Sequence, residues 1–382
     1  MSAELTEARL ARALTLTEEA TGVTRALAGV VHLGHEFAPV FRLVFVDGLS
    51  VVVKTPRPPD TLHPFGSGLS FRREQAALAL VQDTNLAPVL VGADDDVGVL
   101  VTSDLGDSVL DLIIRGSDRE RAWRAMEGYG ASMGRLHALT SRKIDEYAAE
   151  RTRLDFPATD AERAGTWTGL DAWHDIETAC LALRLPDARH VRDDIAWLRD
   201  SIIEDRWTAL AHGDLSPWNT HVAADDTVTF VDFEGATFGH IGFDASWIHY
   251  PFTNCSDRWS VLPPDIVTAT EDAYRAELAR TLPAARDDSA FRTMIAVGAA
   301  GALLVRLQRL HLLASDGQTS YDSWRRRTQT AHQLDVFAGL ADAAGCVPLL
   351  ARWCQDLGFA MRSRWTDCGV PPAPHFAAFE PG

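Results

Sequence analysis

Residues 211–235 read AHGDLSPWNTHVAADDTVTFVDFEG, and this segment is the most informative part of the chain. Asp214 lies in a polar segment, Asn219 follows five positions later, and Asp232 comes 13 positions after Asn219, at the end of an apolar run. Two short apolar runs joined by a turn at 224–227 predict a β-hairpin, which returns Asp232 to the start of the segment. The three side chains then converge. Two of them offer the hard oxygen ligands that suit Mg²⁺, and the remaining carboxylate is left to accept a proton.

The same spacing resembles the catalytic core of the eukaryotic-like kinase superfamily, in which a catalytic-loop Asp precedes an Asn by five residues and a later strand-end Asp binds metal. The His-Gly-Asp and Asp-Phe-Glu forms are similar to the aminoglycoside phosphotransferase and choline kinase branch. The resemblance implies that Asp214 is the catalytic base and that Asn219 and Asp232 hold Mg²⁺ on the nucleotide phosphates. It also implies that His212 supports the loop through hydrogen bonds. A polar loop before an ordinary surface hairpin is the alternative interpretation, which the Asn and Asp spacing disfavours.

A kinase needs a cation on the phosphates of its nucleotide. Lys54 is one of only two lysines among the 36 basic residues, and it ends a β-branched run at 49–54 that follows an Asp-Gly hairpin turn. In the resembled family this hairpin forms the nucleotide-binding loop, which implies that Lys54 contacts the α- and β-phosphates and that Gly34 belongs to the loop. The segment lacks the G-x-G-x-x-G spacing. A helix predicted at 71–81 carries Glu74, which the resemblance implies braces the lysine. The alternative interpretations are that Lys54 is an exposed lysine at the end of a strand and that Glu74 is an ordinary acidic residue on a helix surface.

Further segments match the resembled family in order. A strand and a hinge that join two lobes are expected near residue 104, and Val101 and Ser103 are implied to meet the adenine through backbone groups. A Leu-His pair near the end of a long helix predicted at 119–139 resembles the helix that packs beneath the catalytic loop. Asp244 matches the second Asp of a later segment and is implied to brace that loop.

These patterns predict an α+β chain with a bilobal protein-kinase-like fold. A small antiparallel-sheet lobe with a leading helix and one long inserted helix is expected over residues 1–103 and would bind the nucleotide. A larger, mostly helical catalytic and substrate-binding lobe is expected over 104–370, and a loosely ordered Pro-rich tail over 371–382. The resemblance covers about residues 28–250, and beyond them a helical bundle is predicted. The other predicted helices lie at 189–207, 265–279, 291–313 and 323–344.

The composition limits the partners and the compartment. Lys and Arg number 36 and Asp and Glu number 53, a formal charge of −17 that disfavours nucleic acid and anionic lipid. Five scattered cysteines without a C-x-x-C spacing indicate reduced thiols, and the N-terminal segment has no signal-peptide pattern. The longest apolar run, at 295–305, is about half of a membrane span. We therefore expect a cytoplasmic protein that binds no nucleic acid and no membrane, with its oligomeric state left open.

The resemblance implies that the protein phosphorylates a hydroxyl of a small molecule with ATP and Mg²⁺, and GTP stays open as an alternative to ATP. Residues 1–103 carry 12 acids and 8 bases, whereas the rest of the chain carries 41 acids and 28 bases. This acidic excess suits a cationic acceptor such as an aminoglycoside, and hence antibiotic resistance, but an acidic surface without any such role explains it equally. Choline, homoserine and sugar kinases share the motifs. A catalytically silent kinase-like binding protein is a further alternative.

Ser132 lies in a G-x-S-x-G sequence at 130–134 that matches the nucleophile elbow of hydrolases. That elbow needs a strand before it, whereas the preceding residues have a helical pattern. Ser132 is therefore predicted to be a small residue at a helix-packing face, and a serine hydrolase is the minor alternative.

Overall fold

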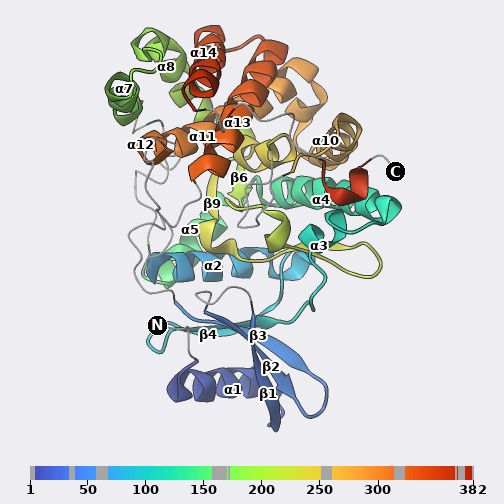
Figure 1. Ribbon diagram of the computed structural model, residues 1–382. Coiled ribbons are helices and arrows are strands. Elements are labelled where there is room, and N and C mark those ends of the chain that lie inside the picture. Colours follow the sequence, from blue (N-terminus) through green and yellow to red (C-terminus); the bar gives the residue numbers. More distant parts are fainter. Residues whose placement is uncertain are drawn as a thin grey trace.

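The structure, a computed structural model, describes residues 5–33, 39–56, 68–156, 170, 173–250, 260–313, 323–365, 368 and 375–380. Its fold is α+β, as predicted, with a small antiparallel sheet in the N-terminal region and a larger helical part (Figure 1). The strands of this sheet are β1 (Leu27–Leu33), β2 (Val40–Phe45), β3 (Ser50–Lys54), β4 (Leu90–Asp94) and β5 (Val99–Ser103). They pair antiparallel throughout, in the order β1-β2-β3-β5-β4.

The sheet has two faces because successive residues of a strand point to opposite sides. One face, with Leu43, Val53 and Val101 among its fully buried side chains, packs on helix α1 (Glu7–Thr21). The opposite face carries Lys54 and faces the helical part, where Lys54 finds its partners. Figure 1 shows α1 on one side of the sheet and the helical part on the other.

Helix α2 (Gly68–Val81) is the long helix inserted between β3 and β4, and it begins three residues before its predicted start. It contacts helix α5 (Ile144–Arg153) and the 3-10 turn η6 (Phe233–Gly235). Arg73 Nη1 donates a hydrogen bond to the backbone oxygen of Glu234 at 3.3 Å. The helix is therefore anchored to the helical part as well as to the sheet.

The helical part also holds two short two-stranded sheets, in which β6 pairs with β9 and β7 with β8. Their strands are β6 (Thr208–Ala211), β7 (Thr220–Val222), β8 (Val228–Phe230) and β9 (Thr237–His240). The remaining helices are α3 (Leu110–Ile114), α4 (Arg119–Thr140), α7 (Trp173–Ala182), α8 (Arg192–Ile202), α9 (Gly242–Ala245), α10 (Pro264–Leu278), α11 (Asp288–Leu307), α12 (Leu310–Leu313), α13 (Ser323–Ala344) and α14 (Pro348–Arg364). Single 3-10 turns are η1 (Gln82–Thr84), η3 (Arg189–Val191), η4 (Asp205–Trp207), η5 (Pro217–Asn219), η7 (Ser246–Ile248), η8 (Pro283–Arg286) and η10 (Ala377–Phe379).

Two predicted helices are interrupted. The prediction at 189–207 is wrong at both ends, where the turns η3 and η4 flank α8, because the chain must turn to enter β6 at Thr208. The prediction at 291–313 divides into α11 and α12, because the backbone N–H of Arg309 bonds to the oxygen of Arg306 in a tight turn.

Helices α4 and α10 cross at very close range. A Cβ atom added at Gly130 or at Gly134 would overlap the backbone oxygen of Thr270 or of Tyr274, both in α10, so only glycine permits this approach. Ser132 lies between the two glycines and is fully buried, and its Oγ donates to the backbone oxygen of Val228 at 3.2 Å. The G-x-S-x-G sequence is therefore a helix-packing motif, as predicted, and not a nucleophile elbow.

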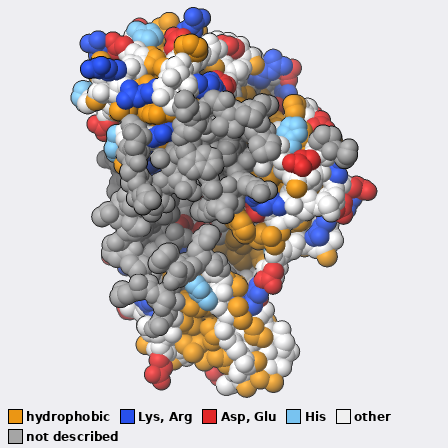
Figure 2. All heavy atoms as spheres, viewed as in Figure 1, with side chains coloured by type: hydrophobic (Ala, Val, Ile, Leu, Met, Phe, Trp, Pro, Cys, Tyr) orange, Lys and Arg blue, Asp and Glu red, His pale blue; other side chains and the backbone are white. Residues whose placement is uncertain are grey.

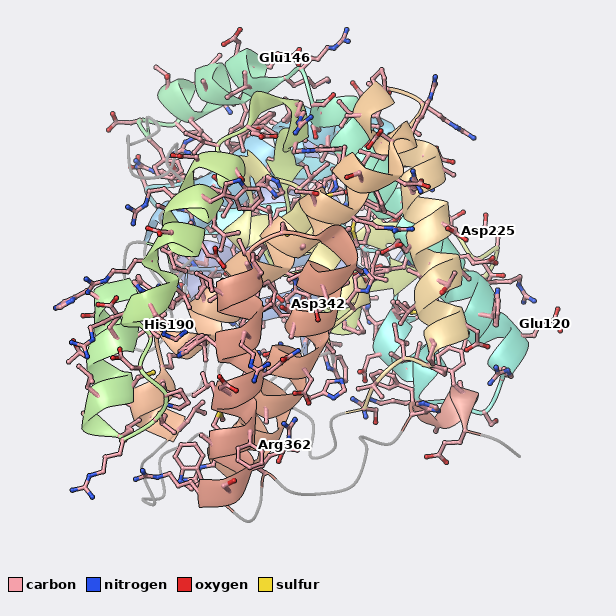
Figure 3. All side chains as sticks on the ribbon, turned by 90° about the horizontal axis from the view of Figure 1, so that it is seen from above. Glu120, Glu146, His190, Asp225, Asp342 and Arg362 are labelled. Carbon is pink, nitrogen blue, oxygen red and sulfur yellow. The ribbon has the colours of Figure 1, made fainter. Side chains whose placement is uncertain are left out.

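The β7–β8 hairpin is fastened to the first turns of α4. Arg124 of α4 donates to Glu120 Oε1 at 2.8 Å and to Asp226 Oδ2, in the turn of the hairpin, at 2.7 Å. Figure 3, seen from above, shows Glu120 and Asp225 along the same edge of the molecule. This attachment holds the hairpin that the sequence predicted to carry the functional residues.

The expectation of a loosely ordered tail is wrong for the described residues 375–380. Phe376 and Phe379 are almost fully buried there. The guanidinium groups of Arg115 and Arg119 lie over the two rings, at 5.5 and 5.8 Å from the ring centres. Burial of these two aromatic side chains stabilises the packing of residues 375–380 against the helical part. The Pro-rich composition of the tail did not indicate this packing.

One described helix, α11, is long and apolar enough to cross a membrane by length and composition alone. Within the structure 67% of its apolar window is buried, against α9 and α13 among others. It is therefore a core helix of the helical part.

On the surface, Figure 2 shows hydrophobic side chains gathered over the end of the molecule that holds the small sheet, where Val31 and Val46 are 48% and 71% exposed.

Candidate active site

The loop after β6 brings the first pair of predicted residues together. Asn219, at the end of η5, donates through Nδ2 to the backbone oxygen of Asp214 at 3.0 Å and to its Oδ2 at 3.1 Å. Strand β8 then returns beside the loop, since the backbone N–H of Val231 donates to the oxygen of Asn219 at 2.9 Å. Asp232 follows directly, so the hairpin places it next to Asn219 as the spacing predicted.

Asp232 has a left-handed backbone conformation, with φ of 68° and ψ of 58°. This region is disfavoured for residues with a side chain and is found in excess at functional sites. The carboxylate of Asp232 pairs with Lys54 Nζ, 178 residues away in the chain. The hairpin of the helical part therefore meets the sheet at this contact.

Lys54 is surrounded by acidic side chains. Its Nζ lies 2.6 Å from Glu74 Oε2 in α2 and 3.5 Å from Glu234 Oε2 in η6, in addition to the contact with Asp232. Burial lowers the pKa of Lys54, but the charges of Asp232, Glu74 and Glu234 outweigh it and raise the pKa well above its ordinary value. Burial raises the pKa of Glu74, while Lys54 lowers it. One ammonium group thus faces three carboxylates.

Asp244 fixes the start of the loop from beneath. Its carboxylate is fully buried and accepts hydrogen bonds from the backbone N–H groups of His212 at 2.6 Å and Gly213 at 2.9 Å. It also accepts from His137 Nε2 at 3.2 Å, and His137 Nδ1 accepts from the hydroxyl of Tyr274 at 3.1 Å. A chain of buried polar groups thus runs from α10 through α4 and α9 to the loop.

His212 holds the loop against the β8 strand. Its Nε2 donates to the backbone oxygen of Val231 at 3.0 Å, and its Nδ1 accepts from the backbone N–H of Asp214 at 3.3 Å. Burial lowers the pKa of His212, which agrees with the neutral ring that these two bonds require. The side chain thus occupies the supporting position that the sequence predicted.

Asp214 is the one acidic side chain of the loop that is placed to exchange a proton near neutral pH. Burial, followed by the charges of Asp232 and Glu234, raises the pKa of Asp214 to about 7, although the hydrogen bond from Asn219 opposes the shift. A base is most effective when its pKa lies near the working pH. The arrangement is therefore chemically able to transfer a proton at Asp214.

The three residues predicted along the hinge and the nucleotide loop have different outcomes. Gly34 lies outside the described residues. Val101 has its side chain in the core against α1, and the β5 side chains on the face of Lys54 are Leu100 and Thr102. Ser103 Oγ accepts from the backbone N–H of Val89 at 2.9 Å, so its hydroxyl serves the sheet. The contacts expected of Val101 and Ser103 with the adenine are made by backbone groups, so these side-chain positions leave that prediction as it stands.

Glu234 is the site residue that the sequence analysis missed. The Asp-Phe-Glu sequence at 232–234 contains this glutamate, but the resemblance uses it only as a mark of the family branch. A 3-10 turn after Asp232 brings Glu234 back toward Lys54. The useful signal was the acidic residue two positions after the strand-end Asp.

The oxygen atoms of Asn219 and Asp232 suit a hard cation such as Mg²⁺. In the described part of the chain no three His, Cys, Asp or Glu side chains are grouped to hold a metal ion by themselves. Magnesium sites of this kind use one or two protein oxygens and take the rest from phosphate and water. The donor set therefore fits a cation that arrives together with a phosphate ligand.

Comparisons with known proteins give a family and several distant structures. A model of the phosphotransferase enzyme family, APH, matches residues 31–286. An ethanolamine kinase of Plasmodium vivax is 12% identical, with a TM-score of 0.46 over 85% of this chain and 80% of that one. The amicoumacin kinase hAmiN, in complex with AMP-PNP, Ca²⁺ and Ami, is 14% identical, with a TM-score of 0.47 over 93% and 96%. The choline kinase LicA of Streptococcus pneumoniae is 11% identical, with a TM-score of 0.44 over 85% and 98%. No curated protein sequence matches the chain.

Proposed function

This chain belongs to the phosphotransferase enzyme family, and we propose that it is a small-molecule kinase that transfers the γ-phosphoryl group of ATP to a hydroxyl of its acceptor. One observation carries the proposal. Lys54 of the sheet meets Asp232 of the helical part directly beside the pair of Asp214 and Asn219. These are the cation, metal ligands and base that phosphoryl transfer requires.

Each residue then has a role in the proposed reaction. The acceptor hydroxyl attacks the γ-phosphorus, the bond from that phosphorus to the β-phosphate oxygen breaks, and Asp214 takes the hydroxyl proton. Lys54 exchanges part of its carboxylate contacts for the α- and β-phosphates, while Glu74 keeps it in position. Mg²⁺, held by Asn219 and Asp232, would supply charge neutralisation for the phosphates. Catalysis is then mainly positioning and electrostatic stabilisation.

We expect ATP to stabilise the protein only in the presence of Mg²⁺, because the acidic side chains around Lys54 repel an unaccompanied triphosphate. At about 100 times Kd a ligand adds about 2.7 kcal/mol to the free energy of unfolding. For a chain of 382 residues this corresponds to a rise in Tm of about 3 °C in a thermal-shift assay. Asp232→Asn should abolish the shift, and the matched control Asp225→Asn, in the exposed turn of the same hairpin, should keep it. An equal shift with ATP alone would contradict the proposed cation site.

We expect kcat/KM for ATP to rise about tenfold between about pH 6 and about pH 8, because Asp214 must lose its proton to act as a base. The pKa of about 7 that burial gives Asp214 sets this window. Glu234→Gln removes a neighbouring negative charge and should move the rise to lower pH. A profile that is flat over this range would show that Asp214 does not act as the base.

The acceptor class is proposed from charge. The acidic excess of residues 104–382 favours an acceptor with amino groups, such as an aminoglycoside or another cationic antibiotic, and hence a role in resistance. Choline, homoserine and sugars are the alternative acceptors. A panel of these compounds, together with macrolides and nucleosides, in an ATP-consumption assay distinguishes them. A protein that binds Mg-ATP but turns over no compound would be the silent binding protein, against which the four intact site residues argue.

We also propose a cytoplasmic compartment and no nucleic-acid or membrane partner. The described cysteines Cys180, Cys346, Cys354 and Cys368 are all free, which supports a reducing environment. The formal charge of −17 supports the absence of nucleic-acid binding.

A further inference from the structure

Arg42 is a second charged residue on the face of the sheet that carries Lys54. Ladder partners point to the same face, and Val40 of β2 pairs with Lys54 while Arg42 pairs with Val52, two residues before Lys54 on β3. At about 3.3 Å of rise per residue, Arg42 lies about 7 Å from the level of Lys54 along the strands. Arg42 and Lys54 therefore lie on the same side of the sheet, and Arg42 is nearer to the segment that connects the sheet with the helical part.

Two carboxylates from that connection hold the guanidinium group of Arg42. Its Nε lies 2.6 Å from Asp104 Oδ2, and its Nη2 lies 2.7 Å from Asp107 Oδ1. Asp104 is only 7% exposed and also accepts from Ser50 Oγ at 2.7 Å and from the backbone N–H of Gly106 at 3.0 Å. Burial raises the pKa of Asp104, but the bonds from Arg42, Ser50 and Gly106 outweigh it and lower the pKa. The carboxylate of Asp104 is therefore well satisfied and accepts from Arg42 Nη2 at 3.0 Å, whereas the buried Arg42 Nε lies beside it without a hydrogen bond to any described residue.

The two carboxylates neutralise the charge of Arg42, and its side chain stays partly exposed. Two carboxylates on one guanidinium leave no net positive charge for phosphate, in contrast to a cation whose partners can be exchanged. The rest of this face is uncharged in the described residues of β2, β3 and β5 outside Lys54, with Val44, Val52 and Leu100 among them. A planar guanidinium fixed among the uncharged side chains of a sheet face is suited to stack on an aromatic ring.

We propose that Arg42 contacts the purine base of the nucleotide and positions it, with Asp104 and Asp107 orienting the guanidinium plane for stacking. The inference rests on the proposed function, since it takes the phosphates to lie at Lys54. It assigns the phosphate end of the nucleotide to Lys54 and the base end to Arg42. Removal of the Arg42 side chain then weakens the binding of only those ligands that carry a base.

The test compares Mg-ATP with Mg-tripolyphosphate, which has the phosphates and no base, in calorimetric titrations of the full chain. Arg42→Ala should weaken Mg-ATP about tenfold and change the Kd of Mg-tripolyphosphate less than about twofold. Arg42→Lys should not restore ATP binding, because an ammonium group neither stacks as a plane nor bridges two carboxylates. The matched control Arg25→Ala removes another ion pair of the sheet region, to Asp47 at 2.8 Å, and should bind both ligands as the wild type does.

The outcomes separate this inference from a structural role and from the proposed function. Equal weakening of both ligands by Arg42→Ala would mean that Arg42 only holds the fold, and unchanged ATP binding would remove it from the site; either result overturns the inference. Wild-type protein that binds neither ligand would overturn the proposed function itself. Should Arg42→Ala not fold, Asp107→Asn decides, because Asp107 is 81% exposed and its loss releases one side of the guanidinium. That variant should raise the Kd of Mg-ATP about threefold and leave the Kd of Mg-tripolyphosphate unchanged.

Discussion

Asp214→Asn is expected to reduce the rate of phosphoryl transfer about a thousandfold or more, while Mg-ATP still binds with its wild-type Kd. The amide has the shape of the carboxylate but cannot take the proton of the acceptor hydroxyl. Burial already disfavours the charged form of Asp214, as the pKa of about 7 indicates, so the neutral amide should not lower Tm. Single-turnover phosphate transfer, calorimetric ATP titration and thermal unfolding measure the three quantities separately.

The control for this variant is Asp225→Asn, which makes the same chemical change at an exposed position in the turn of the same hairpin. It should transfer phosphate at the wild-type rate. If Asp214→Asn keeps more than about a tenth of the wild-type rate, Asp214 is not the base. If the variant loses ATP binding to the same extent as turnover, its carboxylate serves the nucleotide and not the acceptor.

Gly298→Ala is expected to destabilise the protein by about 3 kcal/mol or more, or to prevent folding. Gly298 lies in the middle of α11, where an added Cβ atom would overlap the backbone of Gly242 at the start of α9. No side-chain rotation relieves a collision between a Cβ atom and a backbone, so the two helices must separate. Because α9 carries Asp244, their separation also withdraws the acceptor of the His212 and Gly213 N–H groups.

The matched control is Gly339→Ala in α13. A Cβ atom at Gly339 meets nothing within 4 Å, and alanine is the better helix former. This variant should keep its stability or gain about 0.5–1 kcal/mol. Denaturant unfolding followed by circular dichroism compares the two variants with the wild type. Equal stability of Gly298→Ala and the wild type would contradict the close packing of α9 on α11.

The local half of the site was predictable from the sequence because one hairpin generates it. Asp214, Asn219 and Asp232 lie within 19 consecutive residues, and a short loop, two strands and a turn leave few ways to fold them. The same holds for Lys54 after its Asp-Gly turn and for Glu74 on the following helix. The alternation of apolar residues and the turn chemistry were sufficient in these segments.

Contacts between distant segments could not be derived in this way. The ion pairs of Arg42 with Asp104 and Asp107 depend on which face of β2 is turned to the helical part, and the strand pattern alone does not indicate that face. Glu234 reaches Lys54 only because the hairpin of the helical part docks against the sheet.

The class of fold and the grouping of Asp214, Asn219 and Asp232 therefore follow from the amino-acid sequence alone, because local spacing and residue type are written along the chain. The packing of distant segments sets the electrostatics of these residues. Burial and neighbouring carboxylates raise the pKa of Asp214, and three carboxylates lie around the ammonium group of Lys54. The tertiary structure also decided where helices touch through glycine and where the two phenylalanines of the tail are buried. Those properties depend on distances between segments far apart in the chain, which are set only when the elements pack together.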